Sequence, residues 1–177
     1  MRVMLKLVGL AILVAIVIGG GLLAYVRVTG LKSLPEPGRL ETRVARAIRS
    51  VAVPPAEKSR VNPFANSREA ANEGLQHFAK YCAMCHANNG SAEKTPIGHG
   101  LFPKPPDLRA ETTQQLTDGE LFYIIENGVR FTGMPAFGAM ERTEAGERQT
   151  WQLVTFVRRL PSISAAEIGW MESLNPL

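Results

Sequence analysis

Cysteine and histidine are scarce in this sequence, which limits the metal chemistry that it can support. The chain of 177 residues has two cysteines and three histidines. Both cysteines, Cys82 and Cys85, lie in the stretch YCAMCH at residues 81–86, where His86 follows directly. A structural zinc site needs four ligands, which the other two histidines supply poorly. A redox-active dithiol of this spacing is expected beside a βαβ unit.

The spacing of these residues favours a different chemistry. Two thiols three positions apart, followed at once by an imidazole, form the pattern by which a haem is attached covalently. Each thiol adds to a vinyl group of the haem, and the imidazole binds the iron. Against a redox dithiol, half of a zinc site or a chance match, we interpret the motif as the attachment site of one haem c. The haem would be bound through Cys82 and Cys85, with His86 as an iron ligand.

Charged residues are absent from Leu7 to Val26, a run of twenty residues. About 20 apolar residues are enough to cross a bilayer as a helix. A cleaved signal peptide is the alternative, since the glycines at 19–21 could serve as a cleavage site, but the run ends in LLAYV, which is a poor one. We therefore predict that residues 1–30 form a transmembrane signal anchor.

Acidic residues are scarce at the start of the chain. Residues 1–63 carry ten Lys and Arg against three Glu, a net +7, whereas residues 64–177 carry ten against thirteen Asp and Glu, a net −3. The basic residues thus lie beside the membrane segment, and nothing supports binding to nucleic acid. The sequence shows no catalytic acid–base pair and no small-molecule substrate site, so we expect no enzymatic activity in the chain alone.

Residues 39–51 have the pattern of a basic amphipathic helix. Apolar residues recur at helical spacing, and arginines fall on the opposite side of the same helix. Such a helix could lie among lipid headgroups, or it could pack on the folded domain or on a neighbouring subunit. Pro54 and Pro55 end it, and we predict a linker at 56–62, so that residues 31–66 form a basic helix and linker.

The next segment resembles a known family. Ser67 is a good helix N-cap, and Gly74, Phe78 and Cys82 then follow at intervals of four. This looks like the N-terminal helix of class I c-type cytochromes, where the glycine lets a C-terminal helix cross closely. A helix between Thr143 and Pro161, with Trp151 in the core, resembles that partner helix. The resemblance implies an all-α, cytochrome c-like haem domain at residues 67–160.

A second iron ligand is expected in the stretch FTGMPAFG at residues 131–138. A thioether suits an iron that cycles electrons, because it favours the ferrous form. Met134 lies in a loop bounded by glycine and proline, and its Met-Pro pair resembles the ligand loop of the family. We predict Met134 as the axial ligand opposite His86. The alternative is His99, in the loop at residues 87–109.

That loop also bears on His86 itself. A histidine ligand generally donates its other N–H to a carbonyl. In the family a proline carbonyl often accepts this bond, and we take Pro103 as the candidate, with Pro105 and Pro106 next. Where the family has a glycine after the histidine, this chain has Ala87.

The resemblance implies a membrane-anchored monohaem cytochrome that carries single electrons between extracytoplasmic respiratory partners. The alternatives are a fixed haem-c subunit of an oxidase or dehydrogenase complex, and a haem enzyme or sensor with an open iron site. Haem c is attached outside the cytoplasm in this family, so we expect the domain on the periplasmic side of a bacterial inner membrane. The positive-inside rule would place the basic segment after the anchor in the cytoplasm. Residues 161–177 form a C-terminal extension with a short helix.

Overall fold

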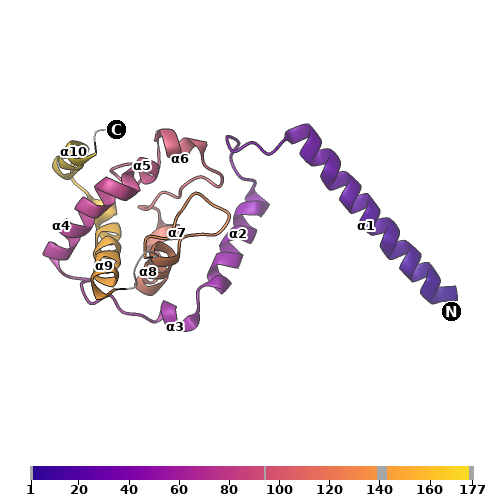
Figure 1. The fold of residues 1–177 in the computed structure, drawn as a ribbon, viewed down its shortest axis with the longest axis horizontal. Coiled ribbons are helices and arrows are strands. Elements are labelled where there is room, and N and C mark those ends of the chain that lie inside the picture. Colours follow the sequence, from indigo (N-terminus) through magenta and orange to yellow (C-terminus); the bar gives the residue numbers. More distant parts are fainter. Residues whose placement is uncertain (1, 94, 139–142, 176–177) are drawn as a thin grey trace. The chain divides into compact units, whose positions relative to one another are not determined.

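The computed structural model describes residues 2–93, 95–138 and 143–175. All regular structure in these ranges is helical (Figure 1), which confirms the predicted all-α class. The chain divides into two compact units, Met1–Pro35 and Glu36–Leu177. Met140, a methionine that is not among the predicted iron ligands, lies outside the described residues.

The first unit is dominated by one helix, α1 (Arg2–Thr29), of 28 residues. At 1.5 Å per residue such a helix is about 42 Å long. None of its residues is buried, and its length and composition are those of a helix that can cross a membrane. The sequence-based expectation of a long apolar helix is therefore met.

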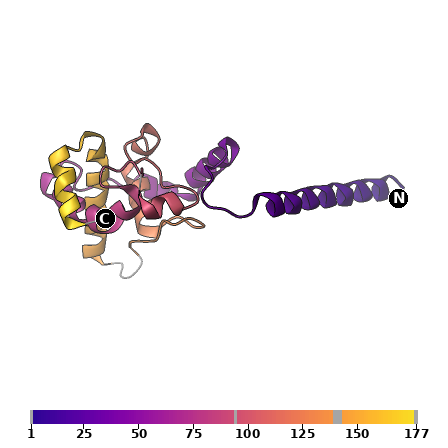
Figure 2. The same ribbon diagram turned by 90° about the horizontal axis from the view of Figure 1, so that it is seen from above.

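The second unit contains the other helices, which surround a core of apolar side chains (Figures 1 and 2). They are α2 (Arg39–Ala52), α3 (Pro55–Lys58), α4 (Arg68–His77), the π turn η1 (Phe78–Cys82), α5 (Ala83–His86), α6 (Pro96–Gly100), α7 (Glu111–Gln114), α8 (Asp118–Asn127), α9 (Glu144–Arg159), the 3-10 turn η2 (Leu160–Ser162) and α10 (Ala165–Leu174).

Helix boundaries follow local signals in the sequence. The side chains of Ser67, Thr117, Thr143 and Ser164 each accept a hydrogen bond from a backbone N–H three residues later, and thereby cap α4, α8, α9 and α10. These bonds satisfy backbone donors that the first turn of a helix leaves free. The cap at Ser67 was predicted from the sequence, and the structure confirms it.

Helices α4 and α9 form the most extensive contact among the described helices. Gly74 lies at their crossing, where an added Cβ atom would come within 2.1 Å of the Gln152 carbonyl oxygen and 3.0 Å of the Phe156 Cβ. Only a residue without a side chain permits this approach of two backbones. The rings of Phe78 and Phe156 pack beside the crossing, with centroids 5.2 Å apart. The predicted crossing of the first and last helices of the domain is thus confirmed.

The segment between α2 and α4 differs from the prediction. We expected a linker at residues 56–62, but this segment packs on the domain. The Arg60 guanidinium lies 4.1 Å from the centroid of the Phe122 ring. Asn62 is buried, and its side-chain amide donates to Thr155 Oγ1 at 3.0 Å. The polar side chains of this segment contact α8 and α9. These partners are remote in the sequence, so the local pattern does not reveal the contacts.

The crossing at Gly74 can be tested with a single methyl group. Gly74→Ala places a Cβ against backbone atoms that cannot move independently, so we expect the free energy of unfolding to fall by about 1 to 3 kcal/mol, as in other overpacked cores. Gly169→Ala in α10 is the matched control, because nothing lies within 4 Å of its added Cβ. Alanine there should raise the free energy of unfolding by roughly 0.5 to 1 kcal/mol. Denaturant unfolding of both variants measures the difference, and equal effects would rule out the close crossing.

Candidate functional site

The helix that carries the cysteine motif changes its winding before the motif. Between α4 and α5 the turn η1 is a π-helix, and the Ala83 N–H donates to the Phe78 carbonyl, five residues back. Single π turns of this kind occur frequently at functional sites. Cys82 ends the π turn, whereas Cys85 and His86 lie on α5, so all three predicted attachment residues belong to the last turns of one continuous helix.

Neither cysteine forms a disulfide in this structure. Burial, with a smaller effect from Cys85, raises the pKa of Cys82 to about 12, and burial also raises the pKa of Cys85. Reactive dithiols and metal-binding thiols have lowered pKa values, because the thiolate is the reactive form. In the part of the chain that the structure describes, no three side chains of His, Cys, Asp or Glu come together as metal ligands. The surroundings therefore differ from those of a redox dithiol or a zinc site.

His86 is held against the core of the domain. Its ring centroid lies 6.4 Å from that of Phe78, and its Nδ1 is buried without a hydrogen-bond partner in the described structure. Burial lowers the pKa of His86, and the Pro106 carbonyl offsets this shift in part. A neutral imidazole with an unpartnered buried nitrogen is suited to bind a metal ion.

Of the three prolines considered as partners of His86, the one whose carbonyl affects the pKa of His86 is Pro106, whereas Pro103 was preferred from the sequence. The segment that carries Pro106 is fixed from both sides. The Leu108 N–H donates to the Gly90 carbonyl at 2.8 Å, and the Gln114 side-chain amide links the carbonyls of Leu108 and Val157. These bonds to residues far along the chain determine which proline reaches the ring, and the local sequence does not contain them.

Helix α6 packs directly on the motif. Thr95 Oγ1 donates to the Cys85 carbonyl at 3.1 Å, and a Cβ on Gly98 would lie 2.5 Å from the same oxygen. The next residue after α6, Leu101, contacts the Met134 loop, since a Cβ on Gly133 would lie 2.5 Å from the Leu101 side chain.

Hydrogen bonds within the Met134 loop hold its backbone. Met134 N–H donates to Thr132 Oγ1 at 3.1 Å, and its carbonyl accepts from the Val129 N–H at 3.1 Å. The Met134 side chain is partly buried, whereas His99 on α6 is exposed. Helix α6 thus contacts the cysteine motif, and Leu101, directly after α6, contacts the loop that carries Met134.

A comparison with protein families gives one match. The model of the family described as cytochrome c oxidase, cbb3-type, subunit III, matches residues 69–157, about half of the chain. The chain belongs to this family. It is therefore a c-type cytochrome that binds haem c and takes part in electron transfer. None of the curated proteins matches the chain.

The residues of this cytochrome fit the haem that the family implies. Two thiols at the end of a helix and a buried, neutral imidazole with an unpartnered nitrogen are the groups that covalent attachment and iron ligation require. Cys82, Cys85 and His86 are brought together on one helix end. Met134 is on a neighbouring loop, and Pro106 takes the position that we had expected for Pro103.

The C-terminal extension bonds to the chain both before and after the cysteine motif. The sequence analysis did not predict this contact. The Asn175 side-chain amide donates to the Ala79 carbonyl in the π turn at 2.7 Å and to Asn88 Oδ1 at 2.8 Å. Met171 of α10 is fully buried in the core. Asn175 thereby ties the turn before the motif to the loop after it, although it lies outside the family match.

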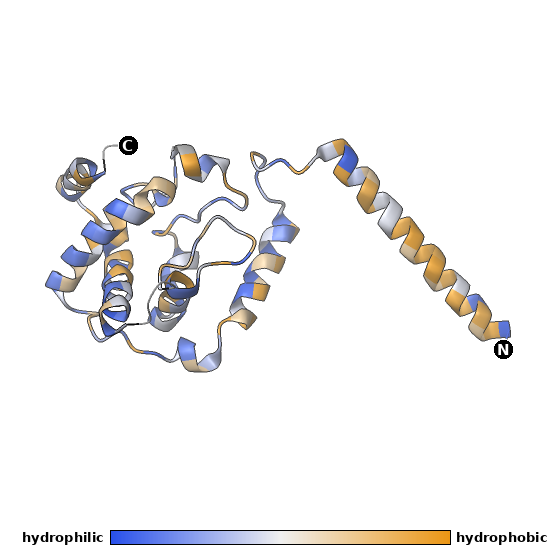
Figure 3. Ribbon diagram, viewed as in Figure 1, coloured by the Kyte–Doolittle hydropathy of each residue, from blue (hydrophilic) through white to orange (hydrophobic). Residues whose placement is uncertain are grey.

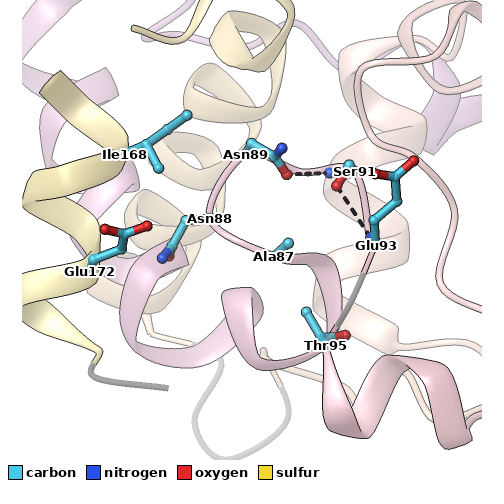
Figure 4. A pocket seen from close by; sticks show the side chains of 8 residues that line it. All are labelled: Ala87, Asn88, Asn89, Ser91, Glu93, Thr95, Ile168 and Glu172. Carbon is cyan, nitrogen blue, oxygen red and sulfur yellow. Dashed lines mark hydrogen bonds between the residues drawn. The ribbon is translucent and has the colours of Figure 1, made fainter. Parts of the chain in front are cut away.

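The loop after His86 and α10 also border a hollow of about 350 Å³ (Figure 4). Asn89 Oδ1 accepts from the Ser91 N–H at 3.0 Å, and Ser91 Oγ accepts from the Glu93 N–H at 3.2 Å, which holds the loop in its turn. Neither the cysteines nor His86 or Met134 line this hollow. It is therefore separate from the predicted haem ligands.

Ala87 has a backbone conformation that favours glycine. Its φ is 59° and its ψ is 159°, in a region that residues with a Cβ rarely adopt. The resemblance to class I cytochromes places a glycine here, and the chain keeps the turn although it has alanine. Such strain costs of order 1 to 3 kcal/mol.

Removal of the Ala87 methyl group should therefore stabilise this cytochrome. Glycine relieves the strain but adds freedom to the unfolded chain, which costs about 0.4 to 1 kcal/mol. We expect Ala87→Gly to raise the free energy of unfolding by roughly 0.5 to 2 kcal/mol. Ala166→Gly, at an exposed position within α10, is the control and should lower it by about 0.5 to 1 kcal/mol. If both substitutions destabilise the protein equally, the turn at Ala87 does not have this conformation.

Proposed function

We propose that this cytochrome is a membrane-anchored monohaem carrier that passes single electrons between extracytoplasmic respiratory partners. The observation that carries the proposal is the one cysteine motif at the end of the α4–α5 helix, in a chain whose only cysteines are those two. With two thiols, the chain can attach one haem through two thioether bonds. Cys82 and Cys85 would form these bonds, and His86 and Met134 would bind the iron.

Haem c itself gains and loses one electron, and the protein sets its position, its iron ligands and the oxidation state that is favoured. The cysteines hold its position, and the core around Phe78 holds the imidazole ring in place. The Pro106 carbonyl, which affects the pKa of His86, would help to hold the orientation of the ring. Met134 supplies a thioether, which favours the reduced state and closes the position at which a substrate or gas could bind. These roles suit electron transfer and not catalysis.

The proposed location is the periplasmic face of a bacterial inner membrane. Helix α1 is long and apolar enough to act as an uncleaved anchor. Haem c is attached outside the cytoplasm in the family that the chain resembles, so the second unit would lie on that side. Electron donors and acceptors would then be membrane-bound dehydrogenases and oxidases, or soluble proteins of the same compartment.

A second candidate function is that of a fixed subunit, because the family description names subunit III of an oxidase. In that case the cytochrome passes electrons within an assembly. Purification of the full chain from its native membranes in mild detergent distinguishes the two functions. A carrier should separate from other proteins as a single haem-staining band, whereas a subunit should co-purify with oxidase components in constant ratio.

The role of Met134 can be measured spectroscopically. Met134→Ala should abolish the weak near-infrared band of sulfur-to-iron charge transfer and allow carbon monoxide to bind the ferrous iron. The reduction potential should fall by part of the roughly 0.8 V range that axial ligands span. Met84→Ala is the matched control, since Met84 lies between the cysteines with its side chain exposed. It should keep the band and the potential.

Haem attachment supplies the second arm of the same experiment. The wild-type protein and Met134→Ala should both retain haem through acid and organic solvent, because the thioether bonds do not involve the methionine. Replacement of Cys82 and Cys85 by alanine should release it. An unchanged band in Met134→Ala would assign the sixth ligand to another methionine, and absence of the band from the wild type would assign it to a residue without sulfur such as His99. Extraction of haem from the wild type would overturn the covalent attachment.

A further inference from the structure

Helix α2 has an apolar face that its own domain leaves uncovered. Its apolar residues fall within an arc of about 80° on the helix. Their exposed fractions are 76% at Leu40, 49% at Val44, 64% at Ile48 and 84% at Val51. Helices α4 and α9 bury the corresponding residues, with Leu75 at 1% and Val154 at 0%. Packing on the haem domain, one of the alternatives that the sequence left open, therefore does not occur along this face.

The opposite face of α2 is strongly basic. Four arginines centre about 150° around the helix from the apolar residues. They are Arg39, Arg43, Arg46 and Arg49. None of them takes part in an ion pair with the described residues, whereas arginines elsewhere in the domain, such as Arg60, Arg109 and Arg158, do. Figure 3 shows that α2 carries both hydrophilic and hydrophobic residues, in contrast to the nearly continuous hydrophobic surface of α1.

We propose that α2 lies in the headgroup layer of an anionic membrane, with its apolar face toward the acyl chains and its arginines at the lipid phosphates. An amphipathic helix of this kind sits about 5 to 10 Å into the boundary between headgroups and acyl chains. The proposal rests on the proposed anchor, since α1 would span the same membrane. The partner is a lipid surface, because an apolar face and unpaired arginines on one helix match a layer that offers both hydrocarbon and phosphate.

The length of the connecting chain supports this location. Nine residues separate Thr29, the last residue of α1, from Arg39, the first of α2. Fully extended, they span about 30 Å, so α2 begins close to the point where α1 would leave the membrane. At its other end α2 is followed by Val53, which is buried in the domain at 4% exposure. A helix bound to the surface would therefore hold the haem domain close to the membrane.

Spin labels on single cysteines test the proposal in the full chain. The native cysteines are consumed by haem, so an added cysteine is the only labelled thiol, which the unsubstituted protein confirms by taking up no label. Val51→Cys and Val61→Cys are a matched pair, since the two valines are 84% and 83% exposed and only Val51 lies on α2. The protein is reconstituted in vesicles of phosphatidylcholine with or without phosphatidylglycerol. The readout is collision of the label with oxygen, which is enriched in lipid, and with a water-soluble nickel complex.

In vesicles with phosphatidylglycerol, we expect the ratio of oxygen to nickel collisions to be several-fold higher at residue 51 than at residue 61. Replacement of Arg43, Arg46 and Arg49 by glutamate should lower the ratio at residue 51, because the apolar face remains but the attraction to phosphate is reversed. Equal ratios at the two positions would overturn the proposal. A residue 51 label shielded from both reagents would also overturn it and assign the face to a protein partner.

Failure of the anchor is distinguished by flotation. If the full chain does not float with the vesicles in high salt, the proposed membrane anchor is wrong, whatever the labels report. If it floats but residue 51 stays in water, the anchor holds and the location of α2 is wrong.

Discussion

The close backbone contact of α4 and α9 at Gly74 sets the position of the helix that carries the cysteine motif. Because α4 continues through the π turn into α5, the crossing also fixes the direction in which Cys82, Cys85 and His86 are presented. Phe78 links the crossing to His86, since its ring centroid lies 5.2 Å from that of Phe156 and 6.4 Å from that of His86. The imidazole is therefore positioned by the hydrophobic core and not by a loop alone, which suits a ligand that must keep its geometry in two oxidation states.

The segments around the motif restrict it further. Helix α6 bonds to the Cys85 carbonyl through Thr95, and Asn175 joins the π turn to the loop that follows His86. The loop keeps a strained alanine at position 87, so the surrounding bonds must hold its conformation. A rigid surround of this kind reduces the rearrangement that accompanies electron transfer. The extension beyond the family match thus contributes to the surroundings of the predicted attachment residues.

The proposed location of α2 accounts for the basic segment that follows α1. By the positive-inside rule its arginines oppose an extracytoplasmic haem domain. On our proposal the arginines of α2 bind lipid phosphates on the side where the domain lies, so they serve the attachment of a helix to the surface. The acidic charge of residues 64–177 then keeps the domain itself from the anionic lipid. On this proposal the arginines of α2 are attracted to the membrane and residues 64–177 are repelled from it, and these two effects together would orient the haem domain.

The sequence by itself determined the features that depend on neighbouring residues. The haem motif, the caps at Ser67, Thr117, Thr143 and Ser164, and the amphipathic pattern of α2 involve groups within a few positions of one another, so a short window of sequence contains the whole physical cause. Gly74 was also recognised, because its spacing from Phe78 and Cys82 is local even though its partner is not.

Only the tertiary structure decided the rest. The packing of residues 56–62 depends on Phe122 and Thr155, the reach of Pro106 to His86 depends on bonds at Gly90 and Val157, and Asn175 bonds to a carbonyl 96 residues away. Polar side chains such as these look like surface residues in the sequence. Their role depends on which remote backbone groups the fold brings within hydrogen-bonding distance, and that is a property of the packed helices as a whole.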